Sequence, residues 1–168
     1  MPTFFKLTPS ELDFAAKAPY CLDNQTLIEA PPEQVFAVLS ESDWHDWFVD
    51  FKSVEWTSPA PYGVGSTRTV VLKTLTVQER FLAWEPGRRF SFSIDAISLP
   101  LVKWMMEDMR LEPVENGRAT RFRWRVYYAP APLMQMAHPI ARGIFGGMFK
   151  ASLNNLKAYA EKKVTVNR

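Results

Sequence analysis

The fold is decided by residues 104–128, which read WMMEDMRLEPVENGRATRFRWRVYY. At the centre of this stretch, Asn116-Gly117 is a residue pair typical of a type I′ hairpin turn, so the flanking segments are predicted to be antiparallel strands. The turn also sets their register: Glu115 lies opposite Arg118, and each further step pairs the next residue on either side. Because side chains alternate between the faces of a sheet, this register divides the hairpin into two faces.

The two predicted faces differ in charge. One is a charged ladder that belongs in water, and its pairs are Glu112 with Arg121, Arg110 with Arg123, and Asp108 with Arg125. The other is apolar apart from one carboxylate, and its pairs are Leu111 with Phe122, Met109 with Trp124, Glu107 with Val126, and Met105 with Tyr128. Glu107 is therefore expected on the inner, apolar face, unless a β-bulge between Met105 and Leu111 turns it outward.

Two earlier turns extend the inner face. A turn at Pro86-Gly87 pairs Ala83 with Phe90, Phe81 with Phe92, and Glu79 with Ile94. A turn at Thr74-Leu75 would pair Val70 with Glu79 and Arg68 with Phe81, which brings Arg68 inward and diagonal to Glu79. The register between strands 88–98 and 104–114 is left open by their loop. One allowed choice places Glu79 and Glu107 on either side of Ile94, about 10 Å apart.

The remaining segments complete an α+β chain with the order βααββββββα. Thr8, Pro9 and Glu11 form a capping pattern that predicts a short helix over about residues 9–17, packed on the outside. A first strand follows near residues 22–30, then a helix opened by Pro31-Pro32-Glu33. A second short helix is expected over residues 42–48, with Trp44 and Trp47 in the core. Six further strands lie between residues 51 and 129, and a long helix runs from after Pro132 to about Lys163.

Composition narrows the class of protein. The 168 residues are 47% hydrophobic and 14% aromatic, which indicates one well-packed core. Cys21 is the only cysteine, so no internal disulfide forms and a cytoplasmic location is expected. The N-terminus has no signal-peptide pattern, and no apolar run reaches the ~20 residues that span a bilayer. A net charge of +2 is too small to indicate that the protein binds an anionic polymer.

Five short motifs resemble the START-like superfamily, specifically its bacterial polyketide cyclase/dehydrase and lipid-transport branch. They are residues 27–36 (LIEAPPEQVF), Trp44 with Trp47, Gly63-Val64-Gly65, residues 85–89 (EPGRR), and residues 153–161 at the end of the last helix. The resemblance implies a helix-grip fold, in which a seven-stranded curved antiparallel sheet wraps the C-terminal helix around a hydrophobic cavity. It leaves residues 1–20 as an N-terminal extension and residues 21–168 as the ligand-binding domain. It implies no particular reaction, because function depends on the site and not on the fold.

The candidate site residues follow from the inner face of the sheet and one face of the last helix. On that helix His138, Phe145 and Phe149 share a face with Ala141, Ser152 and Leu156. Gly146 and Gly147 suggest that something packs closely against the helix there. The ligand-binding candidates are Arg68, Glu79, Phe81, Phe92, Ile94, Glu107, Met109, Trp124, Val126, His138, Phe145 and Phe149.

Each ionisable candidate has a structural alternative. Glu107 is either a cavity acid or ligand anchor with a raised pKa, or it forms an internal salt bridge or reaches solvent near the end of the sheet. Arg68 and Glu79 form a structural ion pair or a catalytic one, and His138 caps or packs the helix or faces the ligand. With two His and one Cys in no ligand spacing, we expect no metal site and no cofactor. The stripe of Arg121, Arg123 and Arg125 is expected to be a solvated ladder and not a nucleic-acid surface.

Three functions are compatible with this pattern. We expect first a protein that binds or carries a small lipid-like or aromatic molecule. The second is an enzyme of the cyclase, dehydratase or hydrolase kind, in which Arg68, Glu79 and Glu107 are the candidate catalytic groups. The third is an interaction module whose cavity is filled by its own side chains. The sequence leaves the ligand, the reaction, the pathway, the oligomeric state and the role of the extension open.

Overall fold

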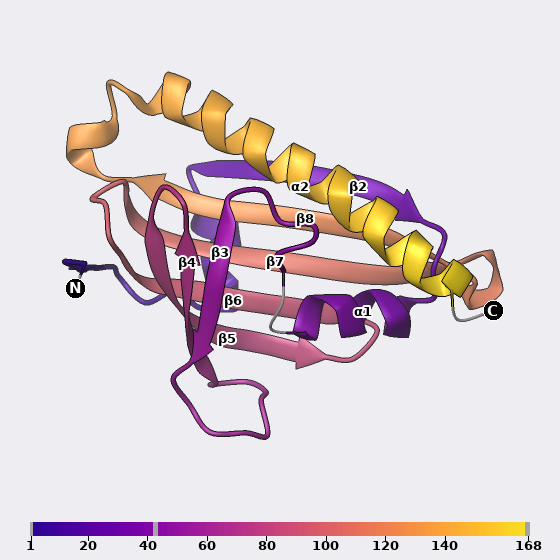
Figure 1. Cartoon of the computed structure of the whole chain (residues 1–168). Helices are drawn as coiled ribbons and strands as arrows, with labels where there is room; N and C mark the ends of the chain where they lie inside the picture. Colours follow the sequence, from indigo (N-terminus) through magenta and orange to yellow (C-terminus); the bar gives the residue numbers. More distant parts are fainter. Residues whose placement is uncertain (1, 42–43, 167–168) are drawn as a thin grey trace.

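The computed structural model describes residues 2–41 and 44–166, which form one antiparallel sheet with a long helix across one face (Figure 1). The seven strands of the continuous path run in the order β2-β8-β7-β6-β5-β4-β3. Their bounds are β2 (Tyr20–Ile28), β3 (Phe51–Trp56), β4 (Thr67–Leu72), β5 (Thr76–Glu85), β6 (Arg89–Ile97), β7 (Val102–Val114) and β8 (Ala119–Pro130). The predicted seven-stranded α+β architecture is confirmed, and a two-residue strand β1 (Phe5–Lys6) is added beside β6.

Two α-helices cover the inner face of the sheet (Figure 1). α1 (Pro32–Ser40) begins at the predicted Pro-Pro-Glu signal, and the ring of Phe36 packs edge-on against Phe90, 5.8 Å away. α2 (His138–Val166) follows a 3₁₀ turn, η3 (Pro132–Met134), and begins beside Pro139, where the fixed proline φ suits a first helical turn. Its buried side chains include Phe149, Leu153 and Leu156.

The predicted second helix over residues 42–48 is wrong within the described residues. Residues 44–50 form successive turns, and residues 42–43 lie outside the described part of the chain. The two tryptophans of this segment are nevertheless buried, with ring centroids 4.7 Å apart, and Trp44 Nε1 donates a hydrogen bond to the Leu39 carbonyl at 2.9 Å. Their burial was predictable because large aromatic rings are core residues with or without a helix.

The register of the β7–β8 hairpin is confirmed. Glu107 lies opposite Val126, Met109 opposite Trp124, and the pairing continues without a shift up to the turn. Asn116 and Gly117 have φ angles of 59° and 82°, the positive values that a type I′ turn requires. Glu115 also has a positive φ of 52°, so the strands end at Val114 and Ala119. Since no bulge falls between Met105 and Leu111, Glu107 faces inward.

The predicted registers of the other hairpins put Arg68, Glu79 and Phe81 on the correct face, but Ala83 is on the outer side, opposite Ser91. Between β5 and β6, Phe81 pairs with Phe92 and Glu79 with Ile94 as expected, but a bulge at Leu82 moves Ala83 from Phe90 to Ser91. Between β4 and β5 the whole register differs by two residues. Arg68 therefore lies directly opposite Glu79, not diagonal to it, because the hydrogen bond from Leu72 N–H to the Leu75 carbonyl closes a two-residue turn one position earlier than predicted.

The allowed register that would place Ile94 between the two glutamates is not the one that the sheet adopts. β6 and β7 pair Phe92 with Glu107 and Ile94 with Met105. Since Glu79 of β5 lies opposite Ile94, the two glutamates lie opposite positions of β6 that are two residues apart. The loop between these strands, residues 98–101, left this register open. It is decided by the tertiary packing of the sheet.

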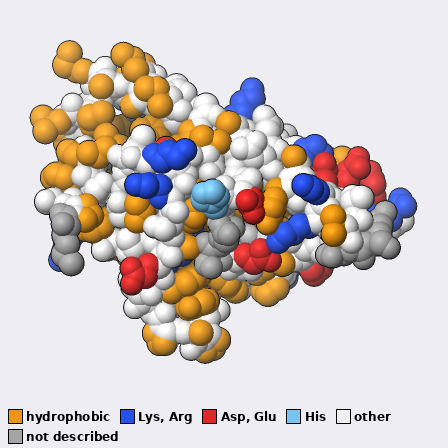
Figure 2. Space-filling model, viewed as in Figure 1, with side chains coloured by type: hydrophobic (Ala, Val, Ile, Leu, Met, Phe, Trp, Pro, Cys, Tyr) orange, Lys and Arg blue, Asp and Glu red, His pale blue; other side chains and the backbone are white. Residues whose placement is uncertain are grey.

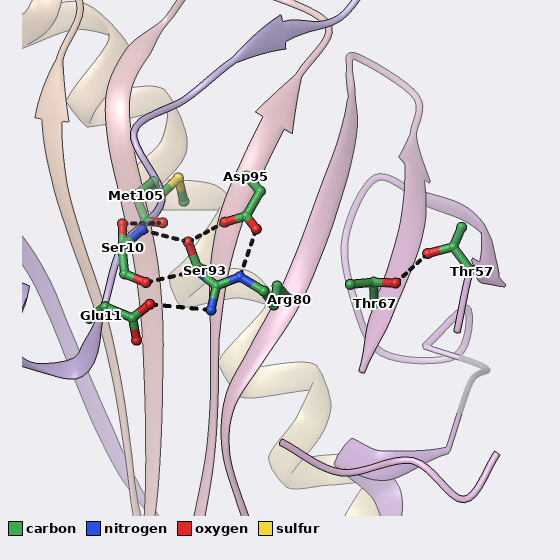
Figure 3. Close-up of polar contacts among 8 residues, drawn as sticks. All are labelled: Ser10, Glu11, Thr57, Thr67, Arg80, Ser93, Asp95 and Met105. Carbon is green, nitrogen blue, oxygen red and sulfur yellow. Dashed lines mark hydrogen bonds and ion pairs between the residues drawn. The ribbon is translucent and has the colours of Figure 1, made fainter. Parts of the chain in front are cut away.

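The N-terminal residues lie on the outer face, as expected, but their predicted cap is wrong. The helix is a 3₁₀ segment, η1 (Leu12–Lys17), and Glu11 does not cap it with its side chain. Instead, Ser10 N–H donates to Ser93 Oγ at 3.0 Å, and Arg80 contacts Asp95 at 2.8 Å and Glu11 at 3.4 Å (Figure 3). In the same view, Thr57 bonds Thr67 at 2.7 Å and holds the end of β3 to β4. Tertiary partners thus outcompete the local capping box.

The expectation that the whole charged ladder faces water is wrong for Asp108. Asp108 is only 2% exposed, and its carboxylate accepts from Arg89 at 2.7 Å and from Arg110 at 3.0 Å. Arg121 pairs with Glu112 at 2.9 Å, while Arg123 and Arg125 both contact Asp23 on β2. The arginine stripe therefore has acidic partners on its own sheet.

Candidate functional site

A pocket of about 110 Å³ lies between the inner face of the sheet and the N-terminal half of α2. Its walls are almost entirely apolar. Eight of the twelve predicted site residues line it: Glu79, Phe92, Ile94, Glu107, Val126, His138, Phe145 and Phe149. The other four, Arg68, Phe81, Met109 and Trp124, are buried behind this lining and do not form its surface. Their part in binding a ligand remains a prediction.

A buried ion pair joins the pocket-lining Glu79 to Arg68, which is not part of the lining. Arg68 Nε contacts Glu79 Oε2 at 2.6 Å, and the two side chains are 1% and 5% exposed. The guanidinium carbon of Arg68 also lies 4.5 Å from the ring centroid of Trp44 and 5.0 Å from that of Phe81. Burial raises the pKa of Glu79, and the positive charge of Arg68 acts against that rise. Because a guanidinium keeps its proton at physiological pH, Glu79 must stay ionised for the pair to be neutral.

Glu107 is the second carboxyl group at the pocket surface. It is 6% exposed, and its Oε2 accepts a hydrogen bond from Trp124 Nε1 at 2.8 Å. Its other oxygen makes no hydrogen bond with any described residue. Burial raises the pKa of Glu107 to about 8, and the nearby negative charge of Glu79 adds to the rise. At neutral pH the group is therefore mostly protonated and can donate a hydrogen bond into the pocket.

A set of polar and aromatic side chains forms the pocket end near the start of α2. His138 Nε2 lies 2.9 Å from Tyr128 Oη, and its ring centroid is 4.1 Å from that of Tyr20. Arg142, one turn further along α2, donates to the Cys21 carbonyl at 3.3 Å. Tyr128, His138 and Arg142 all line the pocket. The predicted His138 thus contacts both a packing partner and the pocket surface.

Sequence reasoning missed several lining residues. Met105 and Tyr128 were on the predicted inner row but were not selected, although both line the pocket. Val70 and Val77 share the inner face of β4 and β5 and could have been chosen by alternation alone. By contrast Leu101 lies in a loop, Pro130 at the end of β8 and Met134 in η3, where no periodic pattern identifies the side chains that point inward.

The expected close approach at the helix glycines is not found. A Cβ placed on Gly146 would meet Leu22 at an ordinary 3.8 Å, and one placed on Gly147 would meet no described atom within 4 Å. Neither position therefore needs glycine for space.

The described residues contain neither a cluster suited to a metal ion nor a helix that could span a membrane. No group of three or more His, Cys, Asp or Glu side chains there is arranged to hold a metal ion. In the same residues, no helix combines the length and apolar character needed to cross a bilayer.

The curved sheet that holds a long C-terminal helix over an apolar pocket defines a START-like protein. A comparison of the sequence with protein families matches residues 21–161 to polyketide cyclase / dehydrase and lipid transport. The chain belongs to that family.

Solved structures share the fold. An aromatase/cyclase from a Streptomyces species superposes with a TM-score of 0.71 at 17% identity, covering 86% of this chain and 95% of that one. A START superfamily protein from Mycobacterium smegmatis superposes with a TM-score of 0.70 at 9% identity, covering 84% and 97%. An uncharacterized protein of Mycobacterium tuberculosis is 31% identical over 154 residues, which is 90% of this chain and 91% of the relative.

Proposed function

We propose that this protein binds a small, mostly apolar molecule in the pocket between the sheet and α2. The observation that carries the proposal is the buried, mostly protonated carboxyl of Glu107 at the surface of a pocket whose lining is mainly apolar. Ligand sites of this kind are typically apolar surfaces with a few polar groups that fix orientation. A ligand with one carbonyl, hydroxyl or ether oxygen would place that oxygen against Glu107 and its hydrocarbon part against Phe92, Val126 and Phe149.

The volume of the pocket limits the size of the ligand. About 110 Å³ is less than the roughly 300–1,000 Å³ typical of sites for drug-sized molecules. A larger ligand would have to move side chains of α2, of which Phe145 and Met148 are only partly buried and Arg142 is exposed. The same small volume is what an interaction module with a self-filled interior would show, so binding has to be measured directly.

A titration with N-phenyl-1-naphthylamine, a neutral apolar fluorescent dye, tests the proposal. Ala141 lines the pocket from α2, so Ala141→Phe should fill part of it and weaken dye binding at least tenfold. Ala151→Phe is the matched control, because Ala151 is exposed on the same helix and should leave the affinity unchanged. Absence of dye binding by the unmodified protein, or equal affinities for both variants, would reject the pocket as a binding site.

An enzymatic role is the second candidate, and the protonation state of Glu107 is the observation that favours it. A carboxyl group with a pKa near neutrality can serve as a general acid or base. The test is a crystal structure with a carbonyl-containing aromatic such as 1-indanone bound in the pocket. An oxygen of the ligand within about 3.2 Å of the Glu107 carboxyl supports this role, and a ligand with no ionisable side chain in reach argues against it.

A further inference from the structure

An exposed apolar surface stands beside the entrance of the pocket. Leu133, Met136, Ile140 and Ile144 are 90%, 96%, 72% and 66% exposed. We name these four residues the apolar rim. Hydrophobic side chains gather at the end of the molecule where the β8–α2 connection and the first turns of α2 lie (Figures 1 and 2). Scattered apolar side chains on a surface are ordinary, but a cluster on one short segment marks an interaction surface.

The rim is continuous with the pocket. Met134, His138 and Ala141 alternate with the rim residues along the chain, and these three side chains line the pocket. Leu101 and Pro130 line it from the neighbouring loop and strand end. The rim and the pocket lining are therefore built from the same stretch of chain.

The segments that carry the rim and the neighbouring loop contain no acidic residue. No Asp or Glu occurs between Asn116 and Ala160, and none occurs in the loop of residues 98–103. Arg142 is exposed, lies between the two rim isoleucines in sequence, and lines the pocket. A surface of apolar side chains with adjacent basic residues is complementary to anionic lipid, since the cation meets the headgroups and the apolar groups enter the acyl boundary.

The shape of the rim favours a fluid surface over a folded partner. Leu133 and Met136 are so exposed that neighbouring side chains of the protein barely cover them. A folded protein would need a fitted hole for each one, whereas lipid adapts to any protruding shape. We propose that the apolar rim docks on the surface of an anionic lipid membrane, so that the pocket exchanges its ligand with that membrane.

Co-sedimentation with vesicles tests the docking. The unmodified protein should bind vesicles of phosphatidylcholine with 30% phosphatidylglycerol, bind vesicles of phosphatidylcholine alone several-fold more weakly, and lose part of the difference in high salt. Ile140→Ser/Ile144→Ser should lower partitioning into anionic vesicles at least tenfold, and Leu133→Ser/Met136→Ser should act in the same direction. Ile and Ser have similar helix propensity, so α2 is preserved.

The matched control is Val64→Ser/Val166→Ser, which removes two apolar side chains that are 71% and 76% exposed elsewhere. It should leave vesicle binding unchanged. Absence of vesicle binding by the unmodified protein, or an equal loss in this control, would overturn the inference. So would a rim that proves to be an interface between copies, seen as a dimer that the isoleucine variant converts to monomer in sedimentation velocity.

The inference rests on the proposed function, because the exchange needs a ligand in the pocket, but separate experiments can disprove the two. Dye titration without vesicles reports the pocket alone, and vesicle binding reports the rim alone. A protein that takes up dye and does not bind vesicles loses the inference and keeps the proposed function. A protein that binds vesicles through the rim and takes up no dye keeps the docking surface and loses both the pocket function and the exchange.

Discussion

Glu107 and the Arg68–Glu79 pair are three ionisable groups in the interior of one small domain. An isolated charge there would cost several kcal/mol, so each group must be neutral or paired. Arg68 and Glu79 neutralise each other at 2.6 Å, and Glu107 stays neutral by keeping its proton. The arrangement is internally consistent, because the negative charge on Glu79 that Arg68 requires also helps to keep Glu107 protonated.

The first prediction concerns pH and Glu107. Its pKa is about 8 in the folded protein and near 4.5 when unfolded. Between these values the folded protein holds a proton that the unfolded chain releases, so the free energy of unfolding falls as pH rises, by up to about 1.4 kcal/mol per pH unit. Glu107→Gln removes this titration and still offers an acceptor to Trp124. Urea denaturation between about pH 5 and 8 should show a flatter profile for the variant.

Glu112→Gln is the control for this measurement. Glu112 is on the same strand but its side chain is 63% exposed, so the pH profile should stay as in the unmodified protein. Because burial also raises the pKa of Glu79, a slope of the same sign should remain in Glu107→Gln. An unchanged profile in Glu107→Gln would mean that its carboxyl is already ionised when buried.

The second prediction concerns the buried ion pair. Arg68→Met leaves Glu79 without its partner and should lower the free energy of unfolding by about 3–5 kcal/mol. Glu79→Leu should cost a similar amount, since it leaves Arg68 charged and buried. The double variant should recover much of the loss, because no charge then remains unpaired. A double-mutant cycle by urea denaturation measures this, and additive losses would show that the pair has no coupling.

At the scale of elements, glycine has different roles in the β7–β8 turn and in α2. Gly117 has a φ of 82°, where a side chain is strained, whereas Gly147 has the ordinary backbone of a helix interior. A Cβ at either position would meet no described atom within 4 Å. The two glycines therefore differ in backbone conformation and not in available space.

The third prediction uses this pair of glycines. Gly147→Ala should raise the free energy of unfolding by up to about 1 kcal/mol, because alanine loses less backbone entropy in a helix. Gly117→Ala should lower it by about 1 kcal/mol or more, since φ must stay positive. Urea denaturation of both variants checks the two signs. A loss of stability in Gly147→Ala would indicate that another group packs against that turn of α2.

At the scale of the whole molecule, the sheet separates two surfaces. The pocket and the apolar rim lie on the side of α2, and the N-terminal residues lie on the outer side. There they cover Ser91, Ser93 and Met106, which are fully buried although they point away from the pocket. Phe14 also packs against Trp104 with ring centroids 5.2 Å apart. Most of the extension therefore packs behind the sheet, and only Tyr20, at its end, contacts the pocket-lining His138.

The fourth prediction follows from this separation and tests the proposed division at residue 20. Deleting residues 2–18 exposes Met106 and leaves Ser93 without its Ser10 donor, so the melting temperature should fall by roughly 2–4 °C for each kcal/mol lost. Affinity for N-phenyl-1-naphthylamine should be unchanged as long as the protein is folded. Thermal denaturation and dye titration of the shortened protein measure both. A folded variant that no longer binds dye would show that the extension shapes the pocket.

The sequence by itself determined which faces of the strands are buried. Alternation has a period of two residues, so a register error of two, as at Arg68 and Glu79, still places both side chains inward. The Asn116-Gly117 turn fixed the β7–β8 pairing because its positive φ angles allow few geometries. The family resemblance, on short motifs in order, was likewise correct.

Tertiary structure decided everything that depends on contacts between distant segments. The pairing of Glu107 with Phe92, the burial of Asp108 and the bonds of Ser10 and Glu11 all involve partners outside the local pattern. The volume of the pocket could not be predicted from the sequence either. It is a small difference between two large volumes, that of the space enclosed by the sheet and helix and that of the side chains that fill it. Periodicity shows which side chains face the interior, and only packing decides which of them border empty space.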